Sequence, residues 1–306
     1  MTRTFQHTLK QILSFEGKGL HTGVPAHLDI IPAAPDSGIR FIRTDLGEDA
    51  VIEALAENVS STARSTTISQ NGASVSTVEH LLSALTGMGV DNAVIRIDGP
   101  EVPILDGSAR PYVEAISRVG LEEQGSERKY ITLDHEIEVK DEQSGSYIRI
   151  SPSDSTGINI TVDFGSRILG VQKASWSPDT DYAVEIGPCR TFVFFHEIEF
   201  LASKGLVKGG DLDNAIVIVE HPVSDAQIDA VCSALGFEKL AITESGYLNN
   251  LELHFPDECG RHKLLDLIGD LRLSGGWLKA NVTAFKPGHT LNTKAAAAIR
   301  QAIGKE

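Results

Sequence analysis

The sequence predicts an α+β fold rather than a doubly wound parallel sheet. Segments with strand-like alternation outnumber those with helical periodicity, and the two kinds do not follow each other in a regular βα order. The chain has 306 residues, of which 41% are hydrophobic and 23% are charged. This length and composition are typical of one large or two smaller globular domains with a sizeable core, and they exclude a disordered or collagen-like chain.

The first half is predicted to contain two strands, a helix, a third strand and a second helix. Alternation of apolar and polar residues between turns predicts strands over 26–31 and 38–42. Over 76–86 the valine and leucine residues recur at helical spacing, which predicts a helix with one apolar face. A strand over 92–97 and a helix over 110–119 complete this half.

The second half repeats the order of strands, helix and strand. The predicted elements are strands over 130–133, 136–140, 147–150 and 158–163, a long helix over 260–273 and a strand over 277–285. A polar, glycine-containing stretch over 121–128 is the candidate boundary, and the predicted domains are 1–124 and 125–306. Both main helices carry a histidine followed closely by two leucines, a short match that hints at an internal duplication.

The charge balance limits the classes of partner. The sequence has 27 Lys and Arg residues against 42 Asp and Glu residues, which gives a net charge of −15. Non-specific binding to nucleic acid or to an anionic membrane requires a basic surface, so we expect neither partner. An anionic substrate would have to be held by a local basic group against the overall field.

The cysteine content and the apolar runs predict a cytoplasmic protein. The three cysteines Cys189, Cys232 and Cys259 are odd in number and contain no CxxC pair, which is typical of a reducing compartment. Residues 1–15 lack the apolar core of a signal peptide, and the strongly apolar run near 215–219 is far too short to span a membrane. We therefore expect a monomer without stable membrane insertion.

The long late helix carries a polar stripe. His262, Asp266 and Asp270 are spaced four residues apart, so they lie near one line along the helix, while the leucines between them form the apolar side. A His and an Asp one turn apart can bind the same divalent ion. The alternative is a solvated helix face with a chance histidine, and the spacing alone leaves both interpretations open.

The early helix contains Glu79 and His80 in the sequence Ser76-Thr-Val-Glu-His80. His80 points away from the apolar face, so it is not simply a core residue. It could be a metal ligand with Glu79 as the adjacent general base. Alternatively, Ser76 and Glu79 have the spacing of a capping box, in which Glu79 reaches back to the start of the helix. Two His and one Asp would leave a fourth zinc position open for water, as in catalytic zinc sites.

Two further segments contain side chains suited to chemistry. His289 follows the last predicted strand within a Gly- and Pro-containing turn, where it is either functional or an exposed loop residue. The segment 189–195 is aromatic-rich in a chain with only 6% aromatic residues, and it contains Thr191 as a possible hydrogen-bond donor. A buried strand is the alternative interpretation of this segment.

Taken together and in order, several motifs resemble one family, the UDP-3-O-acyl-N-acetylglucosamine deacetylases of lipid A biosynthesis. The matching stretches run over nearly the whole chain, and they are Gly19-Leu-His-Thr-Gly23, Ser76-Thr-Val-Glu-His-Leu81, Pro103-Ile-Leu-Asp-Gly-Ser108, Arg190-Thr-Phe192, Gly209-Gly210, Arg261-His-Lys-x-Leu-Asp-x-Ile-Gly-Asp270 and Gly288-His289. The Thr-Val-Glu-His and Arg-His-Lys-x-x-Asp-x-x-x-Asp motifs are specific when they occur together.

The resemblance implies two similar α+β domains, each a sheet packed on helices, with the active site between them. It also implies a zinc ion as cofactor, held by His80, His262 and Asp266. The remaining roles that it implies are Glu79 as general base, His289 as the acid-side histidine, Asp270 as the residue that orients His289, and Thr191 as a donor to the substrate carbonyl or its oxyanion.

The implied substrate is a small molecule, an acylated UDP-amino sugar, which would be hydrolysed to the free amine and acetate. By resemblance, Phe192 packs on the sugar and Lys263 contacts the nucleotide diphosphate. An apolar insert near 192–219 would form a passage for the acyl chain, with a wall drawn from Phe194, Phe195, Leu201, Leu206 and Val207. Each buried methylene of that chain would contribute roughly 0.8 kcal/mol.

Two features of the second half need an interpretation of their own. The stretch 220–257 is longer than in typical members of the family, and Cys259 stands at a ligand-like spacing from His262. We expect Cys259 to be structural or exposed, since a thiolate ligand would close the water position. A non-catalytic module that binds a nucleotide sugar or lipid, and a metal amidohydrolase that acts on another acylated amine, are the alternative functions.

Overall fold

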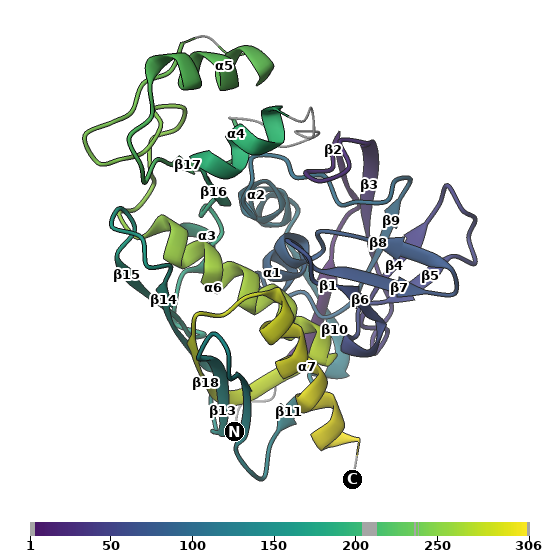
Figure 1. The fold of residues 1–306 in the computed structure, drawn as a ribbon. Coiled ribbons are helices and arrows are strands. Elements are labelled where there is room, and N and C mark those ends of the chain that lie inside the picture. Colours follow the sequence, from purple (N-terminus) through teal and green to yellow (C-terminus); the bar gives the residue numbers. More distant parts are fainter. Residues whose placement is uncertain (1–3, 204–212, 236, 238, 305–306) are drawn as a thin grey trace.

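The computed structural model describes residues 4–203, 213–235, 237 and 239–304 (Figure 1). It is a mixed α+β structure in which several sheets pack against helices, which confirms the predicted fold class. The elements do not alternate regularly between strand and helix, because long runs of strands follow one another both before α1 and over β10 to β15.

The first half of the chain forms three small sheets. The largest has the strand order β2-β3-β9-β4-β5 and is antiparallel except for the β4–β9 pair, and a smaller one has the order β6-β7-β8. Their strands are β2 (Leu13–Lys18), β3 (Pro25–Pro32), β4 (Ile39–Arg43), β5 (Val51–Glu53), β6 (Val59–Ser61), β7 (Thr67–Gln70), β8 (Ala73–Val75) and β9 (Ala93–Ile97).

The polar stretch at the candidate domain boundary is a strand rather than a loop. This strand, β10 (Leu121–Glu127), pairs antiparallel with β1 (Phe5–Leu9) to form the third sheet. The side chains of β10 are half-buried or exposed. For this reason the strand has the polar composition that is typical of a linker. A division after residue 124 cuts through β10, and the two-domain organisation stays a prediction.

The second half forms one six-stranded sheet around its last strand, β18 (Trp277–Phe285). β18 lies between β13, to which it is antiparallel, and β14, to which it is parallel, and its first three residues also pair with β11. The other strands are β11 (Tyr130–Thr132), β12 (Ile137–Asp141), β13 (Ser146–Pro152), β14 (Gly157–Asp163) and β15 (Val171–Trp176).

Two central helices, α1 (Glu79–Gly87) and α6 (Glu258–Leu271), pack directly against each other (Figure 1). A Cβ atom on Gly269 would lie 2.0 Å from the carbonyl oxygen of Glu79, so this close approach requires a glycine. The apolar residues of both helices belong to one hydrophobic cluster with strands of both halves. The remaining helices are α2 (Arg110–Val119), α3 (Tyr182–Glu185), α4 (Phe195–Ser203), α5 (Asp225–Leu235) and α7 (His289–Ile303).

The predicted insert forms a small unit of its own, seen at the top of Figure 1. It consists of the parallel strands β16 (Phe192–Phe194) and β17 (Ile216–Ile218) with helices α4 and α5. We define its insert core as a second hydrophobic cluster, whose buried members are Phe195, Ile198, Val217, Val219, Ile228, Val231, Cys232 and Leu248. The long stretch 220–257 therefore belongs in part to the same unit, because it supplies α5 and Leu248.

The elements that we predicted agree with the observed ones to within a few residues, and two corrections apply besides the one at β10. Short elements such as β5 to β8 and α3 to α5 were not predicted from the sequence. The helix α1 begins at Glu79 instead of residue 76. The chain after the last strand, where we predicted a turn around His289, instead enters the helix α7 at that residue.

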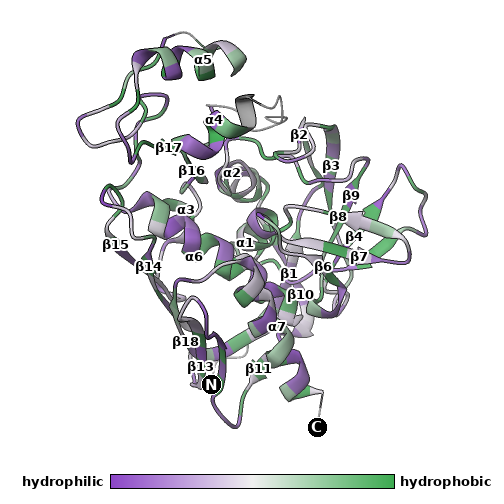
Figure 2. Cartoon of the chain, viewed as in Figure 1, coloured by the Kyte–Doolittle hydropathy of each residue, from purple (hydrophilic) through white to green (hydrophobic). Residues whose placement is uncertain are grey.

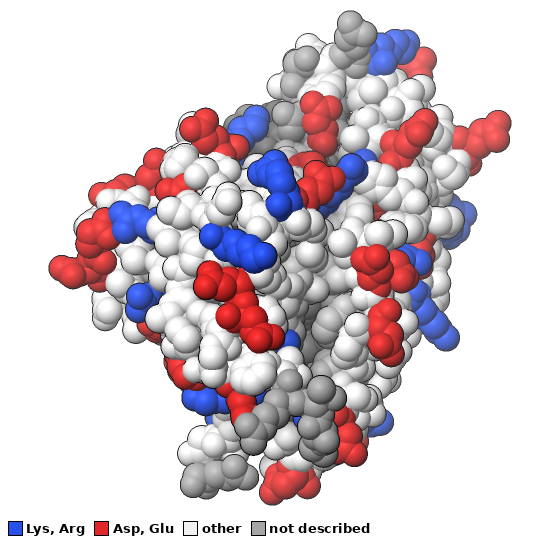
Figure 3. Space-filling view, turned by 180° about the vertical axis from the view of Figure 1, so that it is seen from behind, with Lys and Arg blue, Asp and Glu red and all other residues white. Residues whose placement is uncertain are grey.

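The surface is mixed in charge. Lys and Arg side chains on the face shown in Figure 3 stand among Asp and Glu side chains rather than forming a continuous basic area. Within the described part of the chain, no helix combines the length and the apolar character needed to cross a lipid bilayer.

Candidate metal centre and catalytic site

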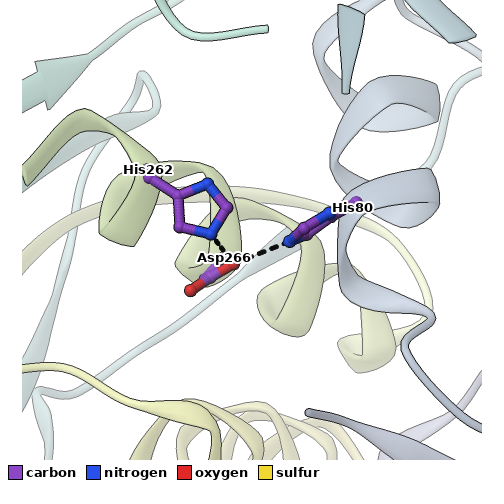
Figure 4. Close-up of side chains that lie close together, drawn as sticks. All are labelled: His80, His262 and Asp266. Carbon is purple, nitrogen blue, oxygen red and sulfur yellow. Dashed lines mark ion pairs between the residues drawn. The ribbon is translucent and has the colours of Figure 1, made fainter. Parts of the chain in front are cut away.

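Three buried side chains converge where α1 crosses α6. His80 comes from the first turn of α1, and His262 and Asp266 come from successive turns of α6 (Figure 4). The Oδ1 atom of Asp266 lies 3.5 Å from Nε2 of His80 and 3.4 Å from Nε2 of His262. The three possible ligand atoms lie within 4.8 Å of one another, so one metal ion could reach all of them. The alternative of a solvated helix face is therefore wrong, because His262, Asp266 and Asp270 are at most 2% exposed.

The α6 stripe is buried although it is polar. Hydrophilic and hydrophobic residues alternate along α6 (Figure 2), and its leucines pack into the main cluster while His262, Asp266 and Asp270 face α1 and α7. Burying charged groups is unfavourable unless they are paired or bind a metal. The arrangement thus indicates a binding or catalytic purpose rather than a contribution to stability.

The Nδ1 atom of His262 already has a hydrogen-bond partner. This atom lies 3.0 Å from the carbonyl oxygen of Cys189, and a carbonyl only accepts, so Nδ1 carries the proton. This leaves the Nε2 lone pair facing Asp266 and His80. Burial lowers the pKa of His262 to about 4, so its ring is neutral at pH 7, as a metal ligand must be.

The hydrogen bonding of the Asp266 carboxylate shows whether a cation could bind between these three side chains. Its Oδ2 atom accepts a hydrogen bond of 2.8 Å from Nζ of Lys263, whereas its buried Oδ1 atom has no hydrogen-bond partner in the described chain. Burial opposes ionisation, but the charge of Lys263, together with smaller contributions from the neighbouring histidines, outweighs it and holds the pKa of Asp266 well below its usual range. One unsatisfied carboxylate oxygen beside two imidazole nitrogens is a donor set that suits a divalent ion such as zinc.

Glu79 lies next to this cluster and does not cap its helix. No side chain caps the start of α1, so the capping-box alternative is wrong. Instead, Oε2 of Glu79 accepts a hydrogen bond of 3.0 Å from the backbone N–H of Thr66, and Oε1 lies 3.8 Å from Nε2 of His289. Burial raises the pKa of Glu79, which is the direction expected for a general base near neutral pH.

His289 faces Glu79 from the first residue of α7. Its Nδ1 atom lies 3.0 Å from Oδ2 of Asp270, which also accepts a hydrogen bond of 2.9 Å from Nδ2 of Asn292. Burial alone would lower the pKa of His289, but the carboxylates of Asp270 and Glu79 outweigh it and raise that pKa to about 9. His289 is mostly enclosed, with its side chain 11% exposed, so the exposed-loop alternative is wrong. The raised pKa favours the protonated ring at neutral pH.

Thr66 joins the two carboxylates and was not identified from the sequence. Its backbone N–H holds Glu79, and its hydroxyl donates a hydrogen bond of 2.6 Å to Oδ1 of Asp270. It is fully buried just before β7. A threonine in a polar stretch ahead of a strand carries no local signal of such a role, so only the fold could reveal it.

The sequence profile of the UDP-3-O-acyl N-acetylglycosamine deacetylase family matches residues 6–229 and 236–301. The chain belongs to this family. Curated relatives include the UDP-3-O-acyl-N-acetylglucosamine deacetylase of Nostoc sp., 40% identical over 96% of this chain and 98% of its own length. The protein of the same name from Saccharophagus degradans is 42% identical over 94% of this chain and 88% of its own length.

Other members of the deacetylase family are longer. The "Bifunctional enzyme LpxC/FabZ" of Porphyromonas gingivalis is 44% identical over 97% of this chain, and the protein of that name from Bacteroides thetaiotaomicron has the same identity over the same share. This chain spans 64% and 65% of their respective lengths.

Of the substrate-side residues that the family resemblance implies, Lys263 lies on α6 and Phe192 packs beside it. The Lys263 ammonium group contacts Asp266 and lies 5.6 Å from the ring centre of Phe192, whose ring also meets His262 edge-on. Thr191 is half-buried, and its backbone N–H donates to the carbonyl of Gly107. Because its ammonium group contacts the Asp266 carboxylate, Lys263 is a direct neighbour of the candidate metal centre, and its charge stabilises ionised Asp266.

The predicted acyl passage is described only in part. Phe194 is half-buried and meets Phe164 edge-on at 6.3 Å between ring centres. Phe195 instead lies inside the insert core, so its side chain packs within the insert. Leu206 and Val207 lie outside the described residues, and the side chain of Leu201 does as well.

Cys259 is buried one turn before His262 and is not part of the metal centre. Burial raises the pKa of its thiol to about 12, so it stays protonated near neutral pH. The three cysteines are all free and buried. This agrees with a structural rather than a ligating Cys259.

Proposed function

We propose that this chain hydrolyses the acetamide of a UDP-3-O-acyl-N-acetylglucosamine to the free amine and acetate, with zinc as its metal. The observation that carries the proposal is the buried His80, His262 and Asp266 set with Glu79 and His289 directly beside it. The printed names of the Nostoc and Saccharophagus relatives support the choice of substrate. We propose further that the chain acts as a monomer in the cytoplasm, as its free, buried cysteines allow.

The metal would be held by Nε2 of His80, Nε2 of His262 and Oδ1 of Asp266. A zinc ion bound to three protein ligands polarises a carbonyl group and lowers the pKa of water to about 7. The neutral ring of His262 and the unsatisfied oxygen of Asp266 are ready to bind it without prior loss of a proton.

Glu79 is proposed to take the proton of the attacking water. The backbone N–H of Thr66 fixes its Oε2 atom, so Oε1 is the oxygen that faces the metal centre and His289. The raised pKa of Glu79 makes it a stronger base than an exposed carboxylate. The same carboxyl group would then hold the proton on the side of the reacting amide.

His289 is proposed to donate a proton to the departing amine. Asp270 accepts from Nδ1 of His289, so the second proton of the imidazolium lies on Nε2, which faces the space beside Glu79 and Asp266. A pKa of about 9 keeps this proton in place at pH 7 and still allows transfer to an amine. Asp270 acts by orienting the ring and by balancing its charge.

The remaining assignments follow the family resemblance. Thr191 would donate to the developing oxyanion, and Lys263 and Phe192 would contact the nucleotide sugar. The acyl chain would run along the insert, where Phe194, Leu201 and Val207 are the proposed wall. We also propose two domains, 1–124 and 125–306, with a boundary that lies within β10.

The decisive experiment is mass spectrometry of UDP-3-O-acyl-N-acetylglucosamine incubated with the purified protein. The protein would first be stripped with a chelator, and zinc or magnesium would then be added. We expect loss of one acetyl group with zinc only, since magnesium prefers an octahedral oxygen site. Tight substrate binding without product in zinc-loaded protein would favour a binding module, and acetyl loss only from other acylated amines in a substrate panel would favour a different amidohydrolase.

A further inference from the structure

A single peptide unit runs alongside α6 and connects two of its residues. The carbonyl of Cys189 accepts the Nδ1 proton of His262 at 3.0 Å. The N–H on the other side of the same peptide bond, that of Arg190, donates to Oε1 of Glu258 at 3.0 Å. Glu258 and His262 are one helical turn apart, so the planar peptide spans that turn and its direction is set at both ends.

Glu258 is held much more firmly than this one bond requires. It is completely buried, and its Oε1 atom also accepts from Nε of Arg190 at 2.8 Å. Its Oε2 atom accepts from the backbone N–H of His254 at 2.6 Å and from Nη2 of Arg190 at 3.2 Å. Burial alone would raise the pKa of Glu258, but the bonds from Arg190 and His254 outweigh it and lower that pKa. The group is therefore an ionised carboxylate with four donors around it.

We propose that Glu258 is a positioning residue for the metal centre: it fixes the Cys189–Arg190 peptide so that the Cys189 carbonyl selects the Nε2-ligating form of His262. Partners of this kind keep ligating histidines in one tautomer and orientation. The inference rests on the proposed zinc site, and it adds a residue that contacts neither metal nor substrate.

The geometry favours this role over a purely structural one. A structural ion pair between Arg190 and Glu258 would need only the guanidinium contacts, whereas here the carboxylate also binds the backbone N–H next to the carbonyl that orients His262. The next residue is Thr191, the proposed oxyanion donor. A rotation of this peptide would thus disturb both the ligand and the donor.

A matched control is available in the same molecule. Asp91 is also buried and also accepts from four donors, namely Nε and Nη2 of Arg128, the backbone N–H of His7 and Nε1 of Trp277. None of these partners belongs to the site. Glu258→Gln and Asp91→Asn each replace one acceptor oxygen by a donor nitrogen, so both variants lose comparable hydrogen bonds in a buried place.

The test measures zinc affinity of the full-length metal-free variants by competition with a coloured chelator, together with Tm, kcat and KM. We expect both variants to melt at lower temperature, but only E258Q to bind zinc about 10-fold or more weakly, with a loss in kcat larger than any change in KM. Zinc affinity of E258Q within about twofold of the wild type would overturn the proposal, and so would an equal loss in D91N.

A second measurement needs no variant. The ¹⁵N NMR spectrum of the histidine rings in the zinc-loaded wild type should show His262 bound through Nε2, with a slowly exchanging proton on Nδ1. Binding through Nδ1 would overturn the proposal even if E258Q does not fold. Because affinity and tautomer are read without turnover, a zinc-binding protein that deacetylates nothing would reject the proposed activity and leave this inference intact.

Discussion

The polar centre between α1 and α6 and the insert core are both buried, but they are built from opposite residue types. The polar centre consists of Glu79, His80, His262, Asp266, Asp270 and His289, whereas the insert core is apolar throughout. Burial of apolar side chains stabilises a fold, while burial of incompletely paired charges destabilises it. Stability and chemistry therefore depend on different parts of this molecule, so substitutions in the two regions should change different measured quantities.

Glu79→Ala should give the largest effect. Removing the general base should lower kcat by about 10²- to 10⁴-fold. Zinc affinity should stay close to that of the wild type, because Glu79 is outside the ligand set. Chelator competition and steady-state kinetics measure the two quantities on one preparation. Near-normal turnover would remove Glu79 from the mechanism.

Asp266→Ala should weaken zinc binding and abolish the stabilisation of the fold by zinc. Losing a ligand should weaken zinc binding by more than the roughly 10- to 100-fold that is typical of losing an outer partner. Zinc at 100 times the wild-type Kd should raise the unfolding free energy of the wild type by about 2.7 kcal/mol, and this gain should vanish in the variant. Equal stabilisation by zinc in both proteins would exclude Asp266 as a ligand.

The stability of the metal-free protein should depend on the protonation of His289. Its pKa is raised from 6.5 to about 9 in the folded state, because Asp270 and Glu79 outweigh the opposing effect of burial. The protonated ring therefore contributes stability that is fully present below pH 6.5 and is lost as the pH rises through 9. The decrease should be about 3 kcal/mol in the unfolding free energy measured with denaturant. His289→Gln should flatten this slope, and an unchanged slope in that variant would contradict the assignment.

Val217→Ala tests whether a substitution in the insert core changes stability without changing zinc affinity. Val217 is fully buried in the insert core, so the substitution should destabilise the protein by about 2 kcal/mol. Zinc affinity should not change, because none of the ligands lies in the insert. Val184→Ala on the exposed side of α3 is the matched control and should alter stability by less than about 0.5 kcal/mol. A large loss of zinc binding in V217A would show that the two regions are coupled.

Thr66→Val should give the smallest effect on catalysis. The valine keeps the backbone N–H that binds Glu79 but lacks the hydroxyl that binds Asp270. We expect kcat to fall about 10-fold, since a buried acceptor loses a partner worth roughly 1–3 kcal/mol. Thr66→Ser should restore most of the rate. Equal rates in the valine and serine variants would show that the hydroxyl has no such role.

Periodicity in the sequence was sufficient to predict the two central helices and the main strands of the two large sheets, but not β1, β2, β5 to β8, β15 to β17 or the helices α3 to α5. The leucine spacing located α1 and α6, and the alternation located β3, β4, β9, β13, β14 and β18. Two differences have physical causes. The segment of β10 has the composition of a linker because a two-stranded, largely exposed sheet needs few apolar residues. The helix α7 has an alanine-rich stretch, 295–298, with high helix propensity, but the Pro287-Gly288 pair directly before it is a turn signal that masks its start.

The candidate site was predictable in part. The spacing of His262, Asp266 and Asp270 placed them on one face, and the family motifs added His80, Glu79 and His289. Spacing could not decide whether this face was solvated, because the answer depends on α1, which is distant in sequence. Thr66 and Glu258 could not be found in this way at all, because their bonds join segments 13 to 204 residues apart.

The glycine at the helix crossing has a consequence for how this protein could be monitored in practice. Since Gly269 allows the α6 backbone to touch the α1 backbone at Glu79, the proposed base and two of the proposed ligands are brought into register by a contact that neither helix can make alone. A partly unfolded chain in which the two helices have separated would keep only His262 and Asp266 on α6 and would lose His80 and Glu79. Tight zinc binding would then report the molecules in which the helix crossing has formed, and a metal-sensitive dye could serve as a folding reporter in a screen of variants or expression conditions.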